Sequence, residues 1–507
     1  MQTLVTGCAL LVLSAAVTPA VAQDAMPQAQ DSYYVAARQS LKARLGEAPR
    51  TGPAKNVILF IGDGMGVSTL TAARILAGQR LGVDGESYSL TMDTLPYTAL
   101  VRTYAHDAQV SDSAPTATAM TTGVKTRNDI IGLNQSATVD DCAGSKDKTV
   151  QTLFEIAETA GLATGVVSTA RITHATPAAA YAHVANRDWE NDGELSAKAK
   201  AEGCIDIARQ MIEWRAGDGF EVMLGGGRAQ FLPSDQADLE DPSAMGLRRD
   251  GRDLTAAWRR ANPKGAYVWN TKGFDAVDPS RTGKLLGLFQ RDHMAYEGER
   301  AADPGGEPSL ADMTAKAIAM LQRDPQGYVL MVEAGRVDHA HHEGLAGRAL
   351  EEAIALDAAV KRALAMVNLD ETLVIVTADH SHGLTISGYP RRGNPILGTV
   401  QGQGGKVAKA ADGKAYTTLS YASGPGAVDG PRTDPATIDT TAPDYHQSAL
   451  FPSRSAAHTG EDIALRAIGP QAHLLQGTIE QNLIFHVMAR ALGGQVASQA
   501  QVAGALD

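Results

Sequence analysis

The sequence repeats one pattern along its length: a short apolar run that ends in glycine or in polar and charged residues. The first run, residues 56–61, ends in the turn Gly62-Asp63-Gly64. A short run that is apolar on both faces is typical of a strand buried in a parallel sheet. Further runs of this kind cover residues 164–168, 220–224, 328–332 and 372–376.

Helical patterns lie between these runs, over residues 149–160, 309–322 and 347–367. Strands that alternate with helices predict an α/β fold with a large, mainly parallel sheet between layers of helices. Ligands of such sheets bind beyond the carboxyl ends of the strands. Most of the chemically interesting Asp, Glu and His residues follow those ends, so we expect the functional site there.

We interpret residues 55–495 as a single domain, preceded by an arm or peripheral helix over residues 23–54 and followed by a tail over residues 496–507. Two stretches interrupt the alternation of strands and helices. Residues 228–308, rich in charge, Pro and Gly, are predicted to be an inserted region. Residues 388–445, rich in Gly, Pro, Thr and Asp, are predicted to be a loop-rich insertion near the site, with room for a few antiparallel strands.

The first 22 residues have the pattern of a signal peptide. An apolar run over residues 10–17 is followed by Pro19 and by Ala20-Val21-Ala22, which fits cleavage before Gln23. No Lys or Arg precedes the run, so an apolar N-terminus without this role is the alternative. We therefore expect a periplasmic or secreted protein. No later stretch has the length and apolarity of a membrane span, and the C-terminal residues 493–507 lack the hydrophobic tail of a lipid-anchor signal, so no membrane anchor is predicted.

Cysteine content and net charge limit the chemistry further. Cleavage would remove Cys8 and leave Cys142 and Cys204. Two cysteines in an exported chain favour one disulfide, with two buried free thiols as the alternative. The net charge of −12 argues against nucleic acid as a partner. It does not exclude a small phosphate ester, because a local metal cluster can outweigh the global charge.

Two polar segments directly after buried runs are candidates for zinc ligands. Asp338 and His342 are four residues apart, a spacing that places them on one face of a helical turn. Carboxylate and imidazole together suit Zn²⁺, although a plain surface helix is the alternative. Asp379 and His380 can reach one ion in an irregular turn, or they are simply a polar exit from a strand. His458 would, on its own, more often be a solvated loop residue.

Oxygen ligands for Mg²⁺ are also available. Asp63 sits in a glycine-flanked turn, where its two carboxylate oxygens can bridge two cations. Glu333 ends another buried run, and Thr176 precedes Pro177 in a loop. A set of ligands with oxygen alone suits Mg²⁺, which keeps its waters.

Ser113 lies where a helix is predicted to begin. The free N–H groups and the dipole of a helix start make a ready phosphate site, and Pro115 fits the first turn. No histidine base is evidently paired with Ser113, so a metal ion is the sensible activator of its hydroxyl. The alternative is an ordinary capping residue with no further role.

Together these segments resemble the alkaline phosphatases, from about Asn56 to Ala489. The segment 112–118, followed by Gly123-Val124-Lys125, is similar to the nucleophile signature of that family. Residues 332–338, 342–344, 377–382 and 458–461 resemble its metal-binding segments. The resemblance implies the family's fold and the hydrolysis of phosphate monoesters through a phosphoserine intermediate.

The resemblance also implies a role for each candidate. The first zinc ion would be bound by Asp338, His342 and His458, the second by Asp63, Asp379 and His380 next to Ser113, and magnesium by Asp63, Thr176 and Glu333. Arg187 would grip the phosphate with its guanidinium fork. Asp112, His174 and His339 would lie beside the ions without binding them. Cys142 and Cys204 match a disulfide pair of the animal-type members, and a homodimer is usual in the family.

Three positions refine the resemblance. His174 and His339 stand where the enterobacterial enzyme has Asp and Lys, as in the vertebrate and some marine bacterial members, and His174 would weaken magnesium binding or admit zinc. Pro115 replaces a small residue of the signature, so the helix start is expected to differ there. Gln290 stands where an animal-type calcium ligand would be Glu, so no calcium is predicted.

Two other functions remain open at this stage. One is a phosphodiesterase or sulfatase of the same superfamily. The other is an exported phosphate-binding or metal-binding protein without turnover.

Overall fold

The computed structural model describes residues 26–494 and residue 496, which form two compact units divided after Pro49. In the first unit, helix α1 (Ser32–Leu45) begins after Asp31, whose carboxylate accepts from the backbone N–H groups of Tyr33 and Tyr34. The predicted signal peptide lies outside the described residues, as does the predicted tail apart from Val496. No helix in the described part of the chain has the length and apolarity needed to cross a membrane.

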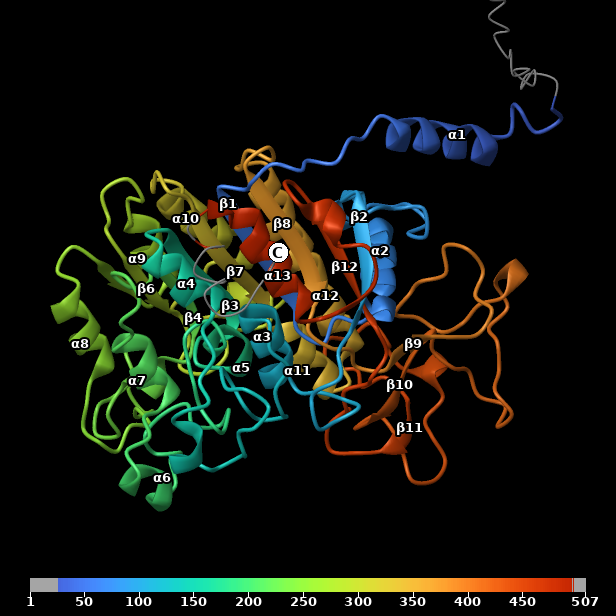
Figure 1. The fold of residues 1–507 in the computed structure, drawn as a ribbon. Coiled ribbons are helices and arrows are strands. Elements are labelled where there is room, and N and C mark those ends of the chain that lie inside the picture. The colour runs from blue at the N-terminus through green and yellow to red at the C-terminus, as the bar shows by residue number, and fades with distance from the viewer. Residues whose placement is uncertain (1–25, 495, 497–507) are drawn as a thin grey trace, which may run out of the picture. The chain divides into compact units, whose positions relative to one another are not determined.

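The second unit is built on a ten-stranded sheet, the main sheet, with the order β13-β2-β12-β8-β1-β7-β3-β4-β6-β5 (Figure 1). Neighbouring strands run parallel, except that β12 is antiparallel to both β8 and β2. The predicted fold class is therefore confirmed. The strands are β1 (Asn56–Gly62), β2 (Tyr97–Arg102), β3 (Ala163–Arg171), β4 (Val222–Gly226), β5 (Ala266–Val268), β6 (Leu285–Leu288), β7 (Tyr328–Ala334), β8 (Thr372–Ala378), β12 (Ile463–Ile468) and β13 (Gly477–Glu480).

The centre of the sheet is buried on both faces, as the apolar runs predict. Ile58 of β1 pairs in register with Leu330 of β7 and with Val374 of β8, and none of the three is exposed. Burying one such side chain stabilises the fold by about 1.5–3 kcal/mol. The central strands are thus held firmly where their carboxyl ends carry polar residues.

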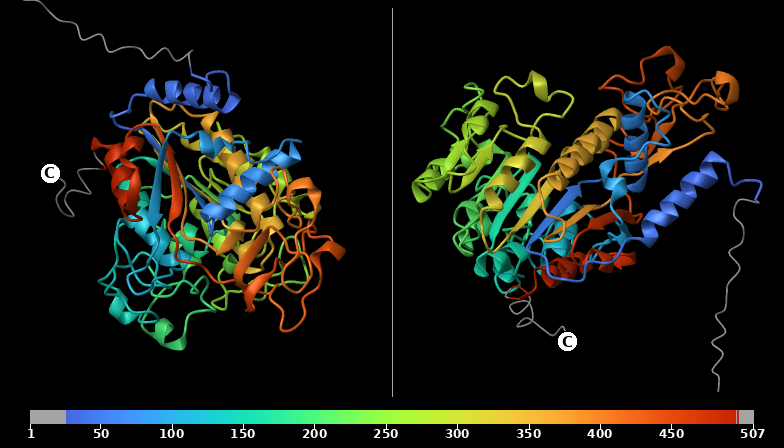
Figure 2. Two further views of the ribbon diagram at one scale, coloured as in Figure 1. Left: turned by 90° about the vertical axis from the view of Figure 1, so that its right-hand side faces the viewer. Right: turned by 90° about the horizontal axis from the view of Figure 1, so that it is seen from above.

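Helices cover both faces of the main sheet (Figure 2). On one face α12 packs on α2 and α10, and on the other α13 packs on α3, which also contacts α4 and α5. The helices of this unit are α2 (Val67–Arg80), α3 (Ser113–Thr122), α4 (Leu153–Thr159), α5 (Ala175–Ala178), α6 (Ala197–Ala201), α7 (Ile207–Ile212), α8 (Leu254–Ala261), α9 (Thr271–Ala276), α10 (Leu310–Leu321), α11 (Arg336–His342), α12 (Ala346–Leu364) and α13 (Leu483–Leu492).

The predicted helices 309–322 and 347–367 correspond to α10 and α12, but the predicted helix 149–160 begins later, as α4. Thr152 sets this start. Its hydroxyl accepts from the backbone N–H of Glu155, whose carboxylate accepts in return from the backbone N–H of Thr152. This reciprocal cap satisfies two donors at the helix start, so the residues before Thr152 stay outside the helix.

The two stretches interpreted as insertions differ in the structure. Residues 228–308 contribute β5 and β6, which continue the main sheet beyond β4, so this stretch is part of the sheet. Around residues 388–445 lies a separate three-stranded sheet of order β11-β10-β9, which we call the small sheet. Its strands are β9 (Leu384–Ile386), β10 (Leu419–Gly424) and β11 (Ala449–Pro452). The pair β9–β10 is antiparallel and the pair β10–β11 parallel.

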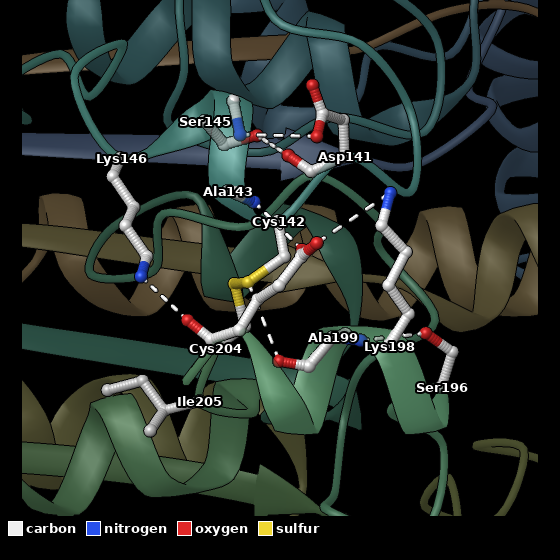
Figure 3. The surroundings of a disulfide bond; sticks show 12 residues. Asp141, Cys142, Ala143, Ser145, Lys146, Ser196, Lys198, Ala199, Cys204 and Ile205 are labelled. Atoms are coloured by element: carbon white, nitrogen blue, oxygen red, sulfur yellow. Dashed lines mark hydrogen bonds and ion pairs between the residues drawn. A yellow bond between two sulfur atoms is a disulfide. The ribbon is translucent and has the colours of Figure 1, made fainter.

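Cys142 and Cys204 form a disulfide (Figure 3), which confirms the predicted bond and excludes the two free thiols. Cys142 is fully buried. The two cysteines are 62 residues apart, and closing a loop of that length stabilises the fold by about 4 kcal/mol in the chain-entropy account.

Candidate metal centre

Three neighbouring strands of the main sheet, β8, β1 and β7, deliver polar residues to one edge. Asp63 follows β1, and Asp379 and His380 follow β8. Glu333 is the next-to-last residue of β7, in register with Ile61 of β1. Asp63, Glu333, Asp379 and His380 have no exposed surface. The register of parallel strands therefore gathers four buried polar groups at the edge where the sequence predicts a site.

Ser113 is the first residue of α3, and Asp112 caps this helix by accepting from the backbone N–H of Ala114 at 2.7 Å. The Ser113 hydroxyl oxygen lies 3.3 Å from Asp63 Oδ2 and 3.3 Å from His380 Nε2. Pro115 lies in the first turn, where its missing N–H leaves nothing unsatisfied. The helix therefore begins at Ser113 as in an ordinary capped helix.

One group of candidate ligands consists of Asp338, His342, His382 and His458, whose ligand atoms all lie within 4.8 Å of one another. Helix α11 carries Asp338 and His342, with Oδ2 and Nε2 3.3 Å apart. His458 is brought beside them by a loop that forms an antiparallel bridge between Thr459 and Ser381.

The orientations of two imidazoles in this group are informative. His342 Nδ1 lies 2.7 Å from the Ala456 carbonyl, and His458 Nδ1 lies 2.9 Å from the Ser111 carbonyl. A carbonyl only accepts, so each Nδ1 carries a proton, and in the neutral ring each Nε2 presents a lone pair. These two Nε2 atoms face each other at 3.1 Å. A shared cation is the natural partner for two lone pairs at this separation.

His382 is a member of this group that the sequence reasoning did not single out. Its Nε2 lies 2.5 Å from Asp338 Oδ1, opposite the oxygen that faces His342. The signal was present, because His382 ends the segment 377–382, which resembles a metal-binding segment of the family.

A second group surrounds Ser113. His380 Nε2 lies 3.4 Å from Asp63 Oδ1 and 3.3 Å from Asp379 Oδ2. Asp379 Oδ1 also accepts from the backbone N–H groups of Gly64 and His380, which fixes its orientation. The structure thus brings together all three residues expected at the second zinc ion, next to the candidate nucleophile.

A third group consists of Asp63, His174 and Glu333, again with ligand atoms within 4.8 Å of one another. The Thr176 hydroxyl and Glu333 Oε1 are buried without a hydrogen-bond partner among the described residues. Such atoms are rare in folded proteins, and a bound cation or water would satisfy both. His174, expected beside the ions, itself offers a nitrogen to this group.

Burial and charge act together on the carboxylates. Burial, with the nearby Asp379, Asp338 and Glu333, raises the pKa of Asp63 well above its usual range. Burial also raises the pKa of Glu333 to about 7. Burial would raise the pKa of Asp338 too, but the neighbouring imidazoles of His342 and His382 hold it well below its usual value. Bound cations would offset this crowding of negative charge, and the donor types fit zinc at the first two groups and magnesium or zinc at the third.

Arg187 lies across the start of α3. Its Nη1 donates to Asp112 Oδ1 at 2.9 Å, and its Nη2 lies 3.0 Å from His174 Nε2. The guanidinium and the first N–H groups of α3 can therefore hold an anion between them.

His339 and one unexpected residue lie beside the third group. The His339 ring is 5.4 Å from that of His174 and 4.0 Å from that of His293. His293 was missed because it lies in the stretch interpreted as an insertion. Gln290, in the same stretch, directs its amide nitrogen toward Asp303 and Glu307, at 3.3 and 3.4 Å.

Comparison with known proteins gives a consistent result. The sequence model of a family described as alkaline phosphatase matches residues 54–493. The tissue-nonspecific alkaline phosphatase isozyme of Gallus gallus is 47% identical over 446 residues, which cover 86% of this chain and 84% of that protein. The Homo sapiens isozyme is 42% identical over 464 residues, covering 90% and 87%.

Solved structures agree with this result. The alkaline phosphatase of Thermus thermophilus is 25% identical, with a TM-score of 0.62, and the match covers 89% of this chain and 94% of that one. The alkaline phosphatase of the Antarctic bacterium TAB5 is also 25% identical, with a TM-score of 0.59 and coverage of 87% and 99%.

Proposed function

The chain belongs to the alkaline phosphatase family, and from this membership we propose that it hydrolyses phosphate monoesters to alcohol and inorganic phosphate through a phosphoserine on Ser113. The observation that carries the proposal is the position of the Ser113 hydroxyl. It lies at a helix start and within 3.4 Å of both Asp63 and His380, two residues of a group of candidate metal ligands.

The proposed occupancy follows the three groups. Asp338, His342 and His458 would hold one zinc ion, Asp63, Asp379 and His380 a second, and Asp63, Thr176 and Glu333 a magnesium ion. His382 would orient Asp338 through their 2.5 Å contact. When bound, these ions would supply a lower pKa for the Ser113 hydroxyl and stabilise the negative charge of the leaving oxygen.

The residues of the chain have their own part in the reaction. The Ser113 oxygen forms a bond to phosphorus as the bond to the alcohol oxygen breaks, and the proton that the serine loses ends on the departing alcohol. Arg187 and the N–H groups at the start of α3 hold the non-bridging oxygens throughout. Water then replaces Ser113 at phosphorus. One proton of this water passes to the serine oxygen, its oxygen stays on phosphorus, and inorganic phosphate is released.

The same proposal extends to setting and substrate. Small phosphate monoesters fit the site, and the net charge of −12 disfavours nucleic acid. We propose a periplasmic or secreted enzyme, which the disulfide supports because such bonds persist in oxidising compartments. A homodimer, usual in the family, is part of the proposal.

Trapping the intermediate tests the nucleophile. Wild-type protein quenched with acid after exposure to labelled phosphate ester should carry label on Ser113, and Ser113→Ala should carry none. We expect Ser113→Ala to keep its metals and to lose about 10⁴-fold or more in kcat, as for other enzymes that lose their nucleophile. A fully active Ser113→Ala would refute the assignment, and a wild type without turnover would indicate a binding protein.

Substrate preference tests the reaction class. Turnover of an aryl phosphate, an aryl phosphodiester and an aryl sulfate should be compared on one preparation with its metals. We expect the monoester to be fastest, because Arg187 and the cations suit a doubly charged phosphoryl group. A faster diester or sulfate would favour the rival classes of the same superfamily.

A further inference from the structure

Four consecutive residues at and just after the end of α11, residues 341–344, contact the region of the small sheet. We define the small-sheet region as residues 384–457. The His341 imidazole contacts the Tyr421 hydroxyl, and the carbonyls of the next three residues accept hydrogen bonds from the small-sheet region. The His342 carbonyl accepts from the Ala456 N–H at 2.8 Å and the Gly344 carbonyl from the Gln447 N–H at 2.9 Å. Between them, the Glu343 carbonyl accepts from the His446 imidazole at 2.7 Å. Figure 1 shows α11 beside the small sheet.

The contact made by Tyr421 joins two buried side chains, whereas the other three contacts are accepted by backbone carbonyls. The Tyr421 hydroxyl, on β10, lies 2.6 Å from His341 Nδ1. His341 Nε2 lies 3.0 Å from the hydroxyl of Thr69, on α2. Tyr421, His341 and Thr69 are at most 3% exposed. One buried imidazole therefore links the small sheet, α11 and α2, a helix that packs on α12.

His341 is not itself a candidate metal ligand. Among the described residues, the groups that could hold a metal do not include it. A neutral imidazole has one donor and one acceptor, and the two flanking hydroxyls satisfy both. The contacts thus fix the orientation of His341, next to His342 in the chain.

The helix in question is too short to hold its own geometry. α11 has seven residues, about two turns, and isolated helices of that length are unstable in water. It nevertheless carries both Asp338 and His342, whose positions define the first group of ligands. External contacts at its end must therefore keep His342 in place.

We propose that Tyr421 is a positioning residue for the first metal ion, acting through His341 to hold the end of α11 and so slowing the loss of that ion. This inference rests on the zinc occupancy proposed above. Without the hydroxyl, a buried nitrogen of His341 has no partner, and relief of that cost requires movement of the helix end. Groups that orient metal ligands typically change metal affinity 10–100-fold.

The test compares two tyrosines of the small-sheet region in the enzyme purified with its metals. Tyr421→Phe removes the hydroxyl that contacts His341. Tyr416→Phe is the matched control, because no hydrogen-bond partner of its hydroxyl is found among the described residues. Each protein is exposed to a chelator for timed intervals, and retained zinc is measured by elemental analysis, together with kcat and KM.

We expect Tyr421→Phe to lose one equivalent of zinc about tenfold faster than wild type. The other equivalent should leave at the wild-type rate, because Asp63, Asp379 and His380 are held by the main sheet. Added zinc should restore kcat, and Tyr416→Phe should match wild type in every measurement. Thr69→Val removes the other contact of the same imidazole and should also speed the loss of zinc. It replaces Tyr421→Phe as the test variant if Tyr421→Phe does not fold.

Two results would overturn the inference while the proposed function stands. One is unchanged zinc loss in both Tyr421→Phe and Thr69→Val. The other is equal acceleration for every ion, which would indicate general loosening of the fold. A wild-type protein that takes up no zinc would overturn the proposed function and this inference with it.

Discussion

The main sheet and the small-sheet region both help to keep the residues of the metal centre in place, and they do so by different means. Asp63, Asp379 and His380 follow neighbouring parallel strands and have no exposed surface. His342 and His458 come from a short helix and a loop, and their side chains are 35% and 15% exposed. The residues around Ser113 are therefore set by strand register, while the first group of ligands depends on contacts made from the periphery.

This difference predicts that the ligands around Ser113 and the first group of ligands tolerate substitution unequally. Two histidine variants give the largest expected effect. His380→Ala should lower kcat/KM by about 10³-fold or more, and added zinc should restore little, because the residue lies against Ser113. His458→Ala should lose about 10²-fold at limiting zinc and recover a large part of that in excess zinc. Steady-state kinetics across a zinc titration measures both, and equal recovery would remove the distinction.

A second test concerns stability instead of activity. Ile58→Ala, in the fully buried centre of the main sheet, should lower the free energy of unfolding by about 2–5 kcal/mol. Leu450→Ala, on β11 with 84% exposure, should change it by less than about 0.5 kcal/mol. Denaturant unfolding of the two variants measures both free energies. A large loss in Leu450→Ala would show that the small sheet contributes to the global stability more than its burial indicates.

The smallest expected effect comes from a buried acid on α12, the helix that packs on the main sheet. Burial raises the pKa of Glu352 to about 8, from an ordinary 4.5. The folded protein therefore binds a proton that the unfolded chain has released, so the stabilising contribution is complete below about pH 4.5 and is lost as pH rises through about 8.

Glu352→Gln stays neutral at every pH and keeps an oxygen to accept from the Glu297 N–H. We expect it to be more stable than wild type by about 1–3 kcal/mol above pH 8 and equal to it near pH 4.5. Thermal unfolding across this range measures the difference. Asp439→Asn, at an exposed position near the small sheet, is the control and should follow wild type, and a Glu352→Gln curve parallel to wild type would contradict the expectation.

The same contrast explains what could be predicted from the sequence. The central strands were recognised because each is apolar on both faces, and their polar ends followed directly. The start of α4 was misplaced because the cap between Thr152 and Glu155 acts more locally than the helical pattern. His382 was passed over because its role depends on Asp338, a residue distant in the chain.

Residues 228–308 show a different limit of reading the sequence. Their content of charged residues, Pro and Gly indicated an inserted region, yet Arg228 and Arg248 are fully buried. They pair with Asp238 and Asp206 at 2.7 and 2.8 Å. Composition cannot distinguish charges in water from charges neutralised inside the fold, so two strands of the main sheet and His293 remained hidden.

Asp112 does more than cap α3. One of its oxygens accepts from Arg187, the other accepts from the Asp129 N–H at 2.6 Å, and the Asp129 carbonyl accepts from the Arg187 N–H at 2.7 Å. These contacts link Asp112, Asp129 and Arg187 in a closed ring of hydrogen bonds. Asp129 has a left-handed backbone, with φ of 67°. Thermal displacement of the ring carries Ser113 and Arg187 together, so the distance between attacking oxygen and guanidinium should fluctuate less than the position of either group.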